Sequence, residues 1–333
     1  MRKILVTGGA GYIGSHTVVE LLDSGYEVVI IDNFYNSKPE AIENIKKITN
    51  KNFAFYEGDV RDKNILRVIF NEHKIDAVIH FAGYKAVGES VEKPLMYYRN
   101  NIGCTLSLLE VMQEYNCKKI VFSSSATVYG EPERLPIDEL CRLAVTNPYG
   151  ATKLYIEGIL KDLYISDNDW SIAILRYFNP VGGHESGLIG EEPNGIPNNL
   201  VPYIVKVANK ELPYLNIFGN DYDTPDGTGV RDYIHVVDLA KGHLNSLDFI
   251  MKNKGIDYYN LGTGKGYSVL ELVKTFEKVN KVEIPYKIVD RRPGDIATCY
   301  ADPSYAKKVL KWEAKLGLES MLSSAYKFSK TNK

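Results

Sequence analysis

The first half of the chain alternates short apolar runs with longer amphipathic stretches. Short apolar runs, several of them rich in Val, Ile and Leu, predict strands over Lys3 to Val6, Val28 to Ile31, Phe53 to Tyr56, Ala77 to Ile79, Ile120 to Phe122 and Ile172 to Leu175. Several runs are continuously apolar, which is typical of parallel strands covered on both faces. Because stretches of helical length separate them, we predict an α/β fold with a doubly wound parallel sheet. Ligands bind such sheets at the carboxyl ends of the strands.

After the sixth predicted strand the chain changes to loops rich in Gly, Pro and Asn. We predict two domains, with the parallel sheet in residues 1–179 and a smaller α+β domain for the substrate in residues 180–333. The segments Tyr233 to Val237 and Tyr258 to Leu261 again predict strands. We therefore expect parts of about 230–262 to return to the first domain.

Composition narrows the class of protein. The chain has 333 residues, of which 44% are hydrophobic, and its 40 basic and 42 acidic residues leave a net charge of −2. This balance provides no basic field for nucleic acid, and no apolar run approaches the roughly 20 residues that cross a membrane. The four cysteines form no C-x-x-C pair, so we expect no metal site and no disulfide framework. With no room for a leader before the first strand, we predict a cytoplasmic protein.

Three glycines, Gly8, Gly11 and Gly14, directly follow the first predicted strand and open a helix. Such glycines permit a tight turn and let the backbone approach a pyrophosphate at the helix N-terminus, although a plain tight turn is the alternative. Asp32 ends the second strand 18 residues after Gly14, near the roughly 20 expected for the carboxylate that binds the adenosine ribose. A carboxylate there repels a 2'-phosphate. The pattern predicts a Rossmann-type unit that binds NAD rather than NADP, while a turn role for Asp32 stays open.

Two further strand ends carry candidate cofactor contacts. Asp59 follows the third strand and is positioned to accept a bond from the adenine amino group, although a helix N-cap is the competing role and Asp62 fits that role equally well. Phe81, Ala82 and Gly83 follow the fourth strand, where small residues let the backbone pass close to the cofactor.

A candidate chemical site follows the fifth strand. That strand ends in Ser123 to Thr127, and a later helix opens with Tyr149 and carries Lys153 on the same face. The Tyr-x-x-x-Lys spacing occurs three times, also at Tyr115 with Lys119 and at Tyr326 with Lys330, so position rather than spacing selects Tyr149.

Tyr149 must ionise far below its ordinary range to act as a base. A free tyrosine titrates near 10, and half ionisation at pH 7 requires a drop of about 3 units, or about 4 kcal/mol. We expect the cations of Lys153 and of the oxidised nicotinamide to supply this drop, and Ser125 to align the substrate hydroxyl. The residues therefore predict proton and hydride movement at a carbon-borne hydroxyl, with surface and helix-face roles as the alternative.

Several longer motifs carry a family resemblance. Thr7 to Gly14, His80 to Gly83, Ser123 to Gly130 and the pair Tyr149 and Lys153 resemble the extended short-chain dehydrogenases. The segments Arg176 to Pro180, Gly195 to Leu200 and Gly229 to His235 are similar to those of the UDP-glucose 4-epimerase family. The resemblance runs nearly end to end. It implies an isomerase that oxidises C4 of a UDP-hexose with bound NAD, turns the 4-keto sugar over and returns the hydride to its other face.

The resemblance also implies a set of site residues. Tyr149 is the base, Lys153 lowers its pKa and holds the nicotinamide ribose, and Ser125 contacts the sugar. The implied cofactor contacts are Gly8, Gly11, Tyr12, Ile13, Gly14, Asp32, Asn33, Asn36, Ser37, Asp59, Val60, Phe81, Ala82, Gly83, Lys85, Asn100, Ser123, Tyr149, Lys153 and Phe178. The implied substrate contacts are Ser125, Thr127, Tyr149, Tyr177, Asn179, Asn198, Asn199, Leu200, Asn216, Phe218, Arg231, Arg292, Asp295 and Cys299. The guanidinium group of an arginine forms paired hydrogen bonds with phosphate, which suits Arg231 and Arg292 to a diphosphate. The alternative is that both are solvated charges of surface loops.

One position departs from many bacterial members of the family. Cys299 stands where they have a bulky tyrosine. We hypothesise that the smaller side chain admits a 2-acetamido group, so that UDP-N-acetylglucosamine and UDP-N-acetylgalactosamine are also interconverted. A small buried apolar cysteine is the equally weighted alternative.

Two other functions fit the same fold. A sugar-nucleotide 4,6-dehydratase resembles a pattern with an Asp-Glu pair after the strand-end hydroxyl, where this chain has Ala126 and Thr127. A non-enzymatic NAD-binding regulator would not need Ser125, Tyr149 and Lys153. The family resemblance further implies a homodimer through two helices per subunit, for which Leu95 to Tyr115 and Tyr149 to Tyr164 are long enough.

Overall fold

The central feature of the computed structural model, which describes residues 2–192, 197, 199–292 and 294–331, is a seven-stranded sheet. Its strands are β1 (Lys3–Thr7), β2 (Glu27–Asp32), β3 (Ala54–Glu57), β4 (Ala77–His80), β5 (Lys119–Ser125), β6 (Ser171–Tyr177) and β11 (Gly255–Leu261). They run in the order β11-β6-β5-β4-β1-β2-β3, and every neighbouring pair is parallel. The predicted Rossmann-type α/β fold is confirmed.

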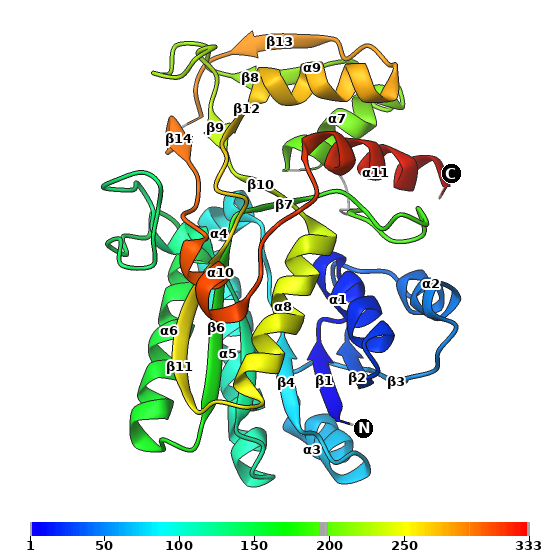
Figure 1. The fold of residues 1–333 in the computed structure, drawn as a ribbon, viewed down its shortest axis with the longest axis vertical. Coiled ribbons are helices and arrows are strands. Elements are labelled where there is room, and N and C mark those ends of the chain that lie inside the picture. Colours follow the sequence, from blue (N-terminus) through cyan, green and yellow to red (C-terminus); the bar gives the residue numbers. More distant parts are fainter. Residues whose placement is uncertain (1, 193–196, 198, 293, 332–333) are drawn as a thin grey trace.

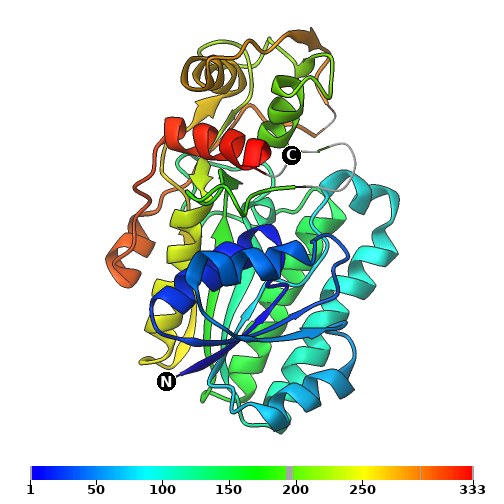
Figure 2. The ribbon, with the colours of Figure 1, turned by 90° about the vertical axis from the view of Figure 1, so that its right-hand side faces the viewer.

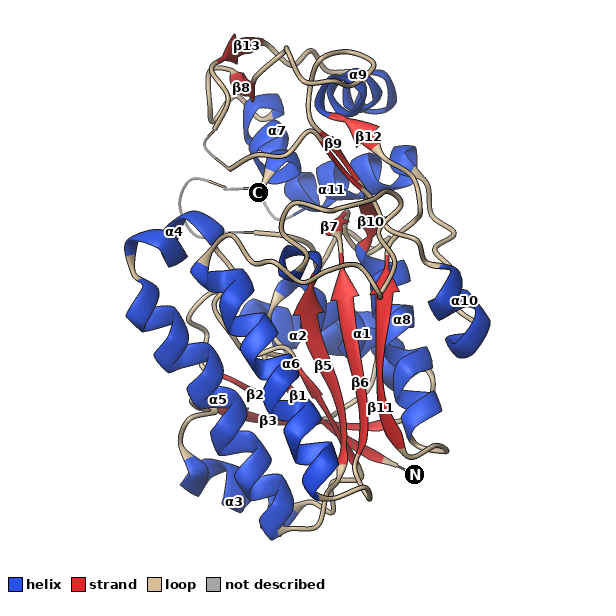
Figure 3. Ribbon diagram, turned by 90° about the vertical axis from the view of Figure 1, so that its left-hand side faces the viewer, coloured by secondary structure: helices blue, strands red, loops and turns tan. Residues whose placement is uncertain are grey.

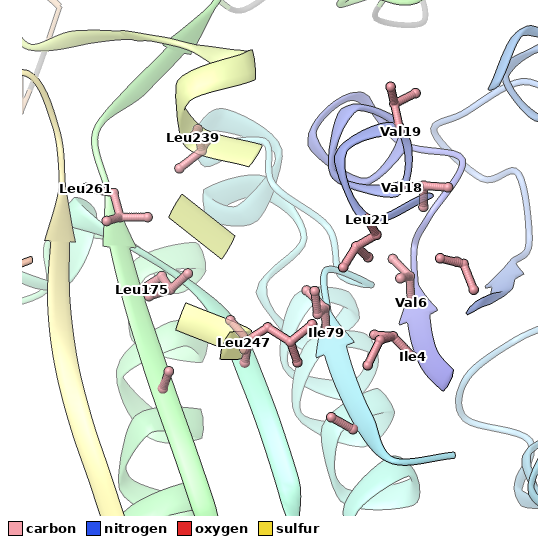
Figure 4. Close-up of a cluster of buried hydrophobic side chains, with 14 of the residues drawn as sticks. Ile4, Val6, Val18, Val19, Leu21, Ile79, Leu175, Leu239, Leu247 and Leu261 are labelled. Atoms are coloured by element: carbon pink, nitrogen blue, oxygen red, sulfur yellow. The ribbon is translucent and has the colours of Figure 1, made fainter. Parts of the chain in front are cut away.

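Helices cover both faces of this sheet. One layer holds α1 (Tyr12–Asp23), α2 (Glu40–Thr49) and α8 (Val236–Ile250), and the other holds α3 (Lys63–Glu72), α5 (Pro94–Glu114) and α6 (Pro148–Ser166). Figure 2 shows the blue helix α1 on one side of the sheet and the cyan and green helices α5 and α6 on the other. Successive residues of a strand point to opposite faces, so Ile4 and Val6 belong to the buried cluster that also holds Leu21 of α1 (Figure 4), whereas Leu5 belongs to the cluster that holds Leu108 of α5. Burial on both faces explains the continuous apolar runs in the central strands β1, β2 and β4.

The later part of the chain forms a smaller group of elements above the carboxyl ends of these strands (Figures 1 and 3). Its helices are α7 (Leu200–Ala208), α9 (Val269–Asn280) and α11 (Leu318–Thr331), which share an apolar core that includes Ile204, Phe276 and Leu322. Its small sheets are β10-β7, β12-β9-β14 and β13-β8, built from β7 (Asn179–Val181), β8 (Leu215–Phe218), β9 (Val230–Arg231), β10 (Tyr233–His235), β12 (Tyr267–Ser268), β13 (Tyr286–Val289) and β14 (Thr298–Cys299). The remaining helical elements are α4 (Val87–Glu92), the short η1 (Ala126–Val128) and α10 (Ser304–Leu310).

The strand predicted from Tyr233 to Val237 is wrong at its end. β10 stops at His235 and pairs with β7 rather than with the central sheet. The His235 ring accepts a hydrogen bond from Val237 N at 3.1 Å and so caps α8, which begins at Val236. A local cap therefore outweighs the β preference of the two valines.

Candidate active site

A single cavity of 590 Å³ lies between the central sheet and the smaller group of elements. All of the expected cofactor residues line it, from Gly8 in the loop after β1 to Phe178 after β6. The expected substrate residues that also line it are Ser125, Thr127, Tyr149, Tyr177, Asn179 and Asn199. The cavity therefore brings the glycine loop and the Tyr149 and Lys153 pair into one site.

The glycine loop leaves no space for side chains. Gly8 has a φ of +70°, and a Cβ on it would lie 2.9 Å from the backbone nitrogen of Ala82. A Cβ on Gly14 would lie 2.3 Å from Gly8 O, so the first turn of α1 packs directly on the loop. Gly11 is the N-cap of α1 and offers no side chain to the first-turn N–H groups. An uncapped helix N-terminus at a close backbone approach fits a pyrophosphate.

Two expected cofactor carboxylates, Asp32 at the end of β2 and Asp59 after β3, lie at the cavity. Asp32 is 7% exposed, and it accepts hydrogen bonds from Ala10 N at 3.0 Å and Ser37 Oγ at 2.8 Å. These bonds hold the carboxylate at the cavity wall. Asp62, not Asp59, caps α3 by accepting from Asn64 N at 2.8 Å. Asp59 lines the cavity, and its hydrogen bonds from Arg61 lower the pKa of its carboxyl.

Residues from the smaller group of elements close the cavity from above. Lys85 Nζ lies 3.0 Å from Glu191 Oε1, which also accepts from Asn199 Nδ2 at 2.8 Å. Tyr12 OH donates to Gly182 O at 2.7 Å and joins the first turn of α1 to the segment after β7. The glycine loop and the upper elements are thus tied across the site.

Tyr149 and Lys153 sit one turn apart at the start of α6, and both are buried. Lys153 Nζ donates to Ser123 O at 2.6 Å and lies 5.8 Å from the centre of the Tyr149 ring. Burial lowers the pKa of Lys153 to about 8, against an opposing effect of the Glu157 carboxylate. Burial also raises the pKa of Tyr149 to about 12, although a hydrogen bond with Ser125 opposes the rise. The protein groups by themselves therefore do not produce the low pKa expected for Tyr149.

The strand end beside Tyr149 is held by hydroxyl contacts. Ser125 Oγ accepts hydrogen bonds from Thr127 N at 3.2 Å and from Thr127 Oγ1 at 3.0 Å. Because Ser125 Oγ accepts from Thr127, its own hydrogen is not used there, and Ser125 also forms a side-chain hydrogen bond with Tyr149. Ser123 Oγ bonds Tyr177 OH on the neighbouring strand. The other two Tyr-x-x-x-Lys pairs contribute no residue to the described lining of the cavity.

A buried ion pair that was not predicted from the sequence supports this strand end. Glu157 receives both arms of Arg176, at 2.6 and 3.0 Å, and it accepts from Ser124 Oγ at 2.5 Å. Both side chains are 3% exposed. A charged residue on a helix is ordinarily expected to face solvent, and the one sequence signal for a buried partner was an arginine directly after the predicted strand Ile172 to Leu175.

The other expected substrate residues that the structure describes do not belong to the described lining of the cavity. The Arg292 guanidinium stacks on the Phe218 ring at 4.7 Å and bonds Asp295 at 2.9 Å, while Arg231 donates to Val230 O at 2.8 Å. Burial raises the pKa of Tyr233 to about 12, and the Arg231 and Arg292 cations both oppose that rise. The two cations therefore face a common region. Leu200 begins α7, Asn216 lies on β8, and Asn198 is outside the described residues.

Cys299 lies on β14, beside Arg231 of β9. Its side chain is half-buried and packs at the edge of an apolar cluster with Tyr129, Ile137 and Phe178. Phe178 lines the cavity, so this cluster adjoins the site from behind.

The parallel sheet, the glycine loop and the Tyr149 and Lys153 pair define an enzyme of the extended short-chain dehydrogenase/reductase class. The family model described as GDP-mannose 4,6 dehydratase matches residues 5–325. A UDP-glucose 4-epimerase of Bacillus subtilis is 61% identical over 99% of this chain and 97% of its own. The chain belongs to the UDP-glucose 4-epimerase family.

Solved structures agree with this assignment. The UDP-glucose 4-epimerase of Bifidobacterium longum, crystallised with NAD+ and UDP, has a TM-score of 0.96 at 57% identity and covers 99% of this chain and 98% of its own. That of Stenotrophomonas maltophila, with bound NAD and formylated UDP-arabinopyranose, has a TM-score of 0.98 at 48% identity and covers 100% and 99%. These comparisons do not favour the dehydratase alternative, and Ala126 and Thr127 offer no carboxylate after β5.

Proposed function

We propose that this enzyme interconverts UDP-galactose and UDP-glucose by transient oxidation at C4 through a 4-keto intermediate. The observation that carries the proposal is the shared cavity, which holds the glycine loop and the Ser125, Tyr149 and Lys153 group. The epimerase family membership supports the same reaction, and the relatives crystallised with NAD support the cofactor.

The loop after β1 is packed so closely that a side chain on Gly8 or Gly14 would collide with backbone. With glycine at these positions the backbone can approach a pyrophosphate, so the loop fits NAD. In the proposed complex, Asp32 binds the adenosine ribose, Lys153 binds the nicotinamide ribose, and the loop Phe81 to Lys85 flanks the phosphates. Bound NAD supplies the hydride acceptor for oxidation at C4 and the donor for the return step.

Tyr149 takes the proton of the C4 hydroxyl in this proposal. Its phenol has a pKa of about 12 in the buried site, so ionisation at pH 7 costs about 7 kcal/mol without further help. The Lys153 ammonium opposes part of this cost, and Ser125 donates a hydrogen bond to the phenolate. Because a cationic nicotinamide strengthens the field, the base is active when the oxidised cofactor is in place.

The two ends of the substrate are proposed to be held differently. Arg231 and Arg292 offer guanidinium groups to the diphosphate, and Phe218 offers a ring to the uridine. The remaining proposed contacts at this end are Asn179, Asn198, Asn199, Leu200, Asn216 and Asp295. Firm contacts to UDP and few contacts to the hexose let the 4-keto sugar turn without escaping.

One assay tests this function directly. Purified protein is mixed with UDP-galactose without added NAD, and the products are identified by chromatography. We expect UDP-glucose; a 4-keto-6-deoxy sugar would instead indicate a dehydratase, and no product would indicate a non-enzymatic binder. Tyr149→Phe should abolish the reaction, whereas Tyr115→Phe, from a pair of the same spacing whose hydroxyl bonds Arg67 O, should retain it.

We also propose that two copies of the chain pair through the outer faces of α5 and α6. Leu95 is 80% exposed, Leu106 43% and Tyr155 53%, and the Tyr98 and Tyr155 rings stack 6.1 Å apart across the two helices. Exposed apolar side chains on two adjacent long helices favour a self-complementary interface. Sedimentation should give a dimer, which Tyr155→Glu dissociates and Ile288→Glu, on distant β13, leaves intact.

We further propose a cytoplasmic location, because Cys104, Cys117, Cys141 and Cys299 are all free thiols, as in a reducing compartment. None of the helices in the described part of the chain combines the length and apolar content of a membrane crossing. Cell fractionation with an antibody against the protein tests the location.

A further inference from the structure

The side chain of Asn101, on α5, is 2% exposed and fully hydrogen-bonded. Its Oδ1 accepts from Tyr84 N at 2.7 Å and from Asn100 Nδ2 at 3.1 Å. Its Nδ2 donates to Tyr84 O at 3.1 Å and to Thr152 Oγ1 at 3.0 Å. These four bonds use both donors and both lone-pair positions of the amide, so its orientation is fixed.

These bonds join two walls of the cavity. On one side Tyr84 lies between Gly83 and Lys85, which both line the cavity. On the other side the Thr152 hydroxyl, fully buried, accepts from Asn101 and donates to Tyr149 O at 2.7 Å. One side chain thus connects the loop after β4 with the turn that carries Tyr149.

The same turn of α5 is also tied to the glycine loop. Thr105 Oγ1 donates to Asn101 O at 3.0 Å and lies 3.0 Å from His80 Nε2, while His80 Nδ1 lies 2.7 Å from Thr7 Oγ1. Because the Thr105 hydrogen is used, His80 donates through Nε2. Burial lowers the pKa of His80 to about 3, so the imidazole is neutral and its Nδ1 accepts from Thr7 Oγ1.

We propose that Asn101 is a positioning residue for the chemistry at C4, acting by holding the loop after β4 in register with Tyr149. The proposal rests on the proposed function, in which the cofactor follows that loop and Tyr149 is the base. Asn101 is absent from the described lining of the cavity, so it acts through Tyr84 and Thr152. Hydride and proton transfer require close alignment, and a displacement of about 1 Å costs roughly 100-fold in rate.

The Thr152 hydroxyl joins Asn101 to the backbone of Tyr149, and it can be removed without changing the shape of the side chain. Thr152→Val should lower kcat per NAD-loaded site about tenfold or more and leave KM unchanged. It should also enlarge the isotope effect for sugar carrying deuterium at C4, because hydride transfer becomes slower. Thr152→Ser restores the hydroxyl and should restore both values.

Thr49→Val is the matched control, because the Thr49 hydroxyl is also buried and donates to a carbonyl of its own helix, Ile45 O at 2.9 Å. It should lower the melting temperature without changing kcat or the isotope effect. If Thr152→Val does not fold, Asn101→Asp, which keeps the acceptor oxygen and loses the Nδ2 donors, should show the same loss of kcat and larger isotope effect.

The outcomes separate this proposal from the function on which it rests. An active wild type beside variants with unchanged kcat and isotope effect overturns the positioning role alone. A loss confined to NAD content or melting temperature overturns it as well. A wild type without epimerase activity overturns the proposed function and this role together.

Discussion

Replacing Lys153 with methionine removes a buried cation beside the proposed base while keeping the length of the side chain. The ammonium lies 5.8 Å from the centre of the Tyr149 ring. At an effective dielectric constant of about 20, a cation at this distance stabilises the phenolate by about 3 kcal/mol. This corresponds to about 2 pKa units, so we expect kcat to fall about 100-fold at neutral pH.

The pH dependence gives a second, independent signature. Because burial lowers the pKa of Lys153 to about 8, the cation is present below that pH and is lost as the pH rises through it. The wild-type kcat should therefore decline above about pH 8, and the methionine variant should lack this decline.

The assay measures conversion of UDP-galactose to UDP-glucose across this pH range, with rates divided by the NAD released from denatured protein. Lys119→Met is the matched control, because Lys119 has the same spacing from Tyr115 but its Nζ lies near Met251 O, 3.5 Å away. A Lys153→Met variant within threefold of the wild type, or one that keeps the alkaline decline, would refute the electrostatic role.

Three further predictions address the cofactor, the sugar and stability. Asp32→Ala removes a carboxylate that should accept hydrogen bonds from the ribose hydroxyls, so NAD affinity should fall roughly 10- to 100-fold and NADP should bind better. Titrations of the wild type and the variant with each nucleotide measure this, and identical binding curves for the two proteins would contradict it. Cys299→Tyr should lower the ratio of N-acetylhexosamine to hexose activity. An unchanged ratio would refute the hypothesis that the small Cys299 side chain admits a 2-acetamido group. His16 and His80 have pKa values lowered to about 3 by burial, so the unfolded chain binds more protons below about pH 6.5. The free energy of unfolding in urea should therefore fall by about 3 kcal/mol between neutral pH and about pH 5.5, and a flat profile would show that these rings are not buried as neutral groups.

The central sheet was predictable because its signals are local. Strands buried on both faces are rich in apolar residues, and most of the first six were visible as runs of Val, Ile and Leu, while the half-buried β3 appeared as the aromatic run Phe53 to Tyr56. The glycine loop was equally predictable, because its glycines stand at fixed spacing directly after the first strand, although the backbone that crowds Gly8 belongs to the distant Ala82.

Features that depend on distant partners were not predictable. Glu157 and Asn101 belong to helices whose periodicity says nothing of the Arg176 or Tyr84 that meets them in space. The pKa of Tyr149 is similar, because spacing identifies the nearby cation but does not measure the burial that opposes it. The substrate role of residues such as Arg231 stays a prediction from family resemblance, because these residues do not belong to the described lining of the cavity.

The place of β11 has a consequence for how this protein can be cut or recombined. β11 pairs with β6 over seven residues from Gly255 to Leu261, although β7, α7, β8, β9 and β10 of the smaller group and helix α8 lie between them in the chain. A fragment ending near Asn179 would expose the whole edge of β6 as unpaired backbone and invite association with other strands. Residues 1–179 alone therefore do not make a complete nucleotide-binding domain that could be fused to another protein. During synthesis on the ribosome, the sheet cannot be completed until most of the chain has emerged.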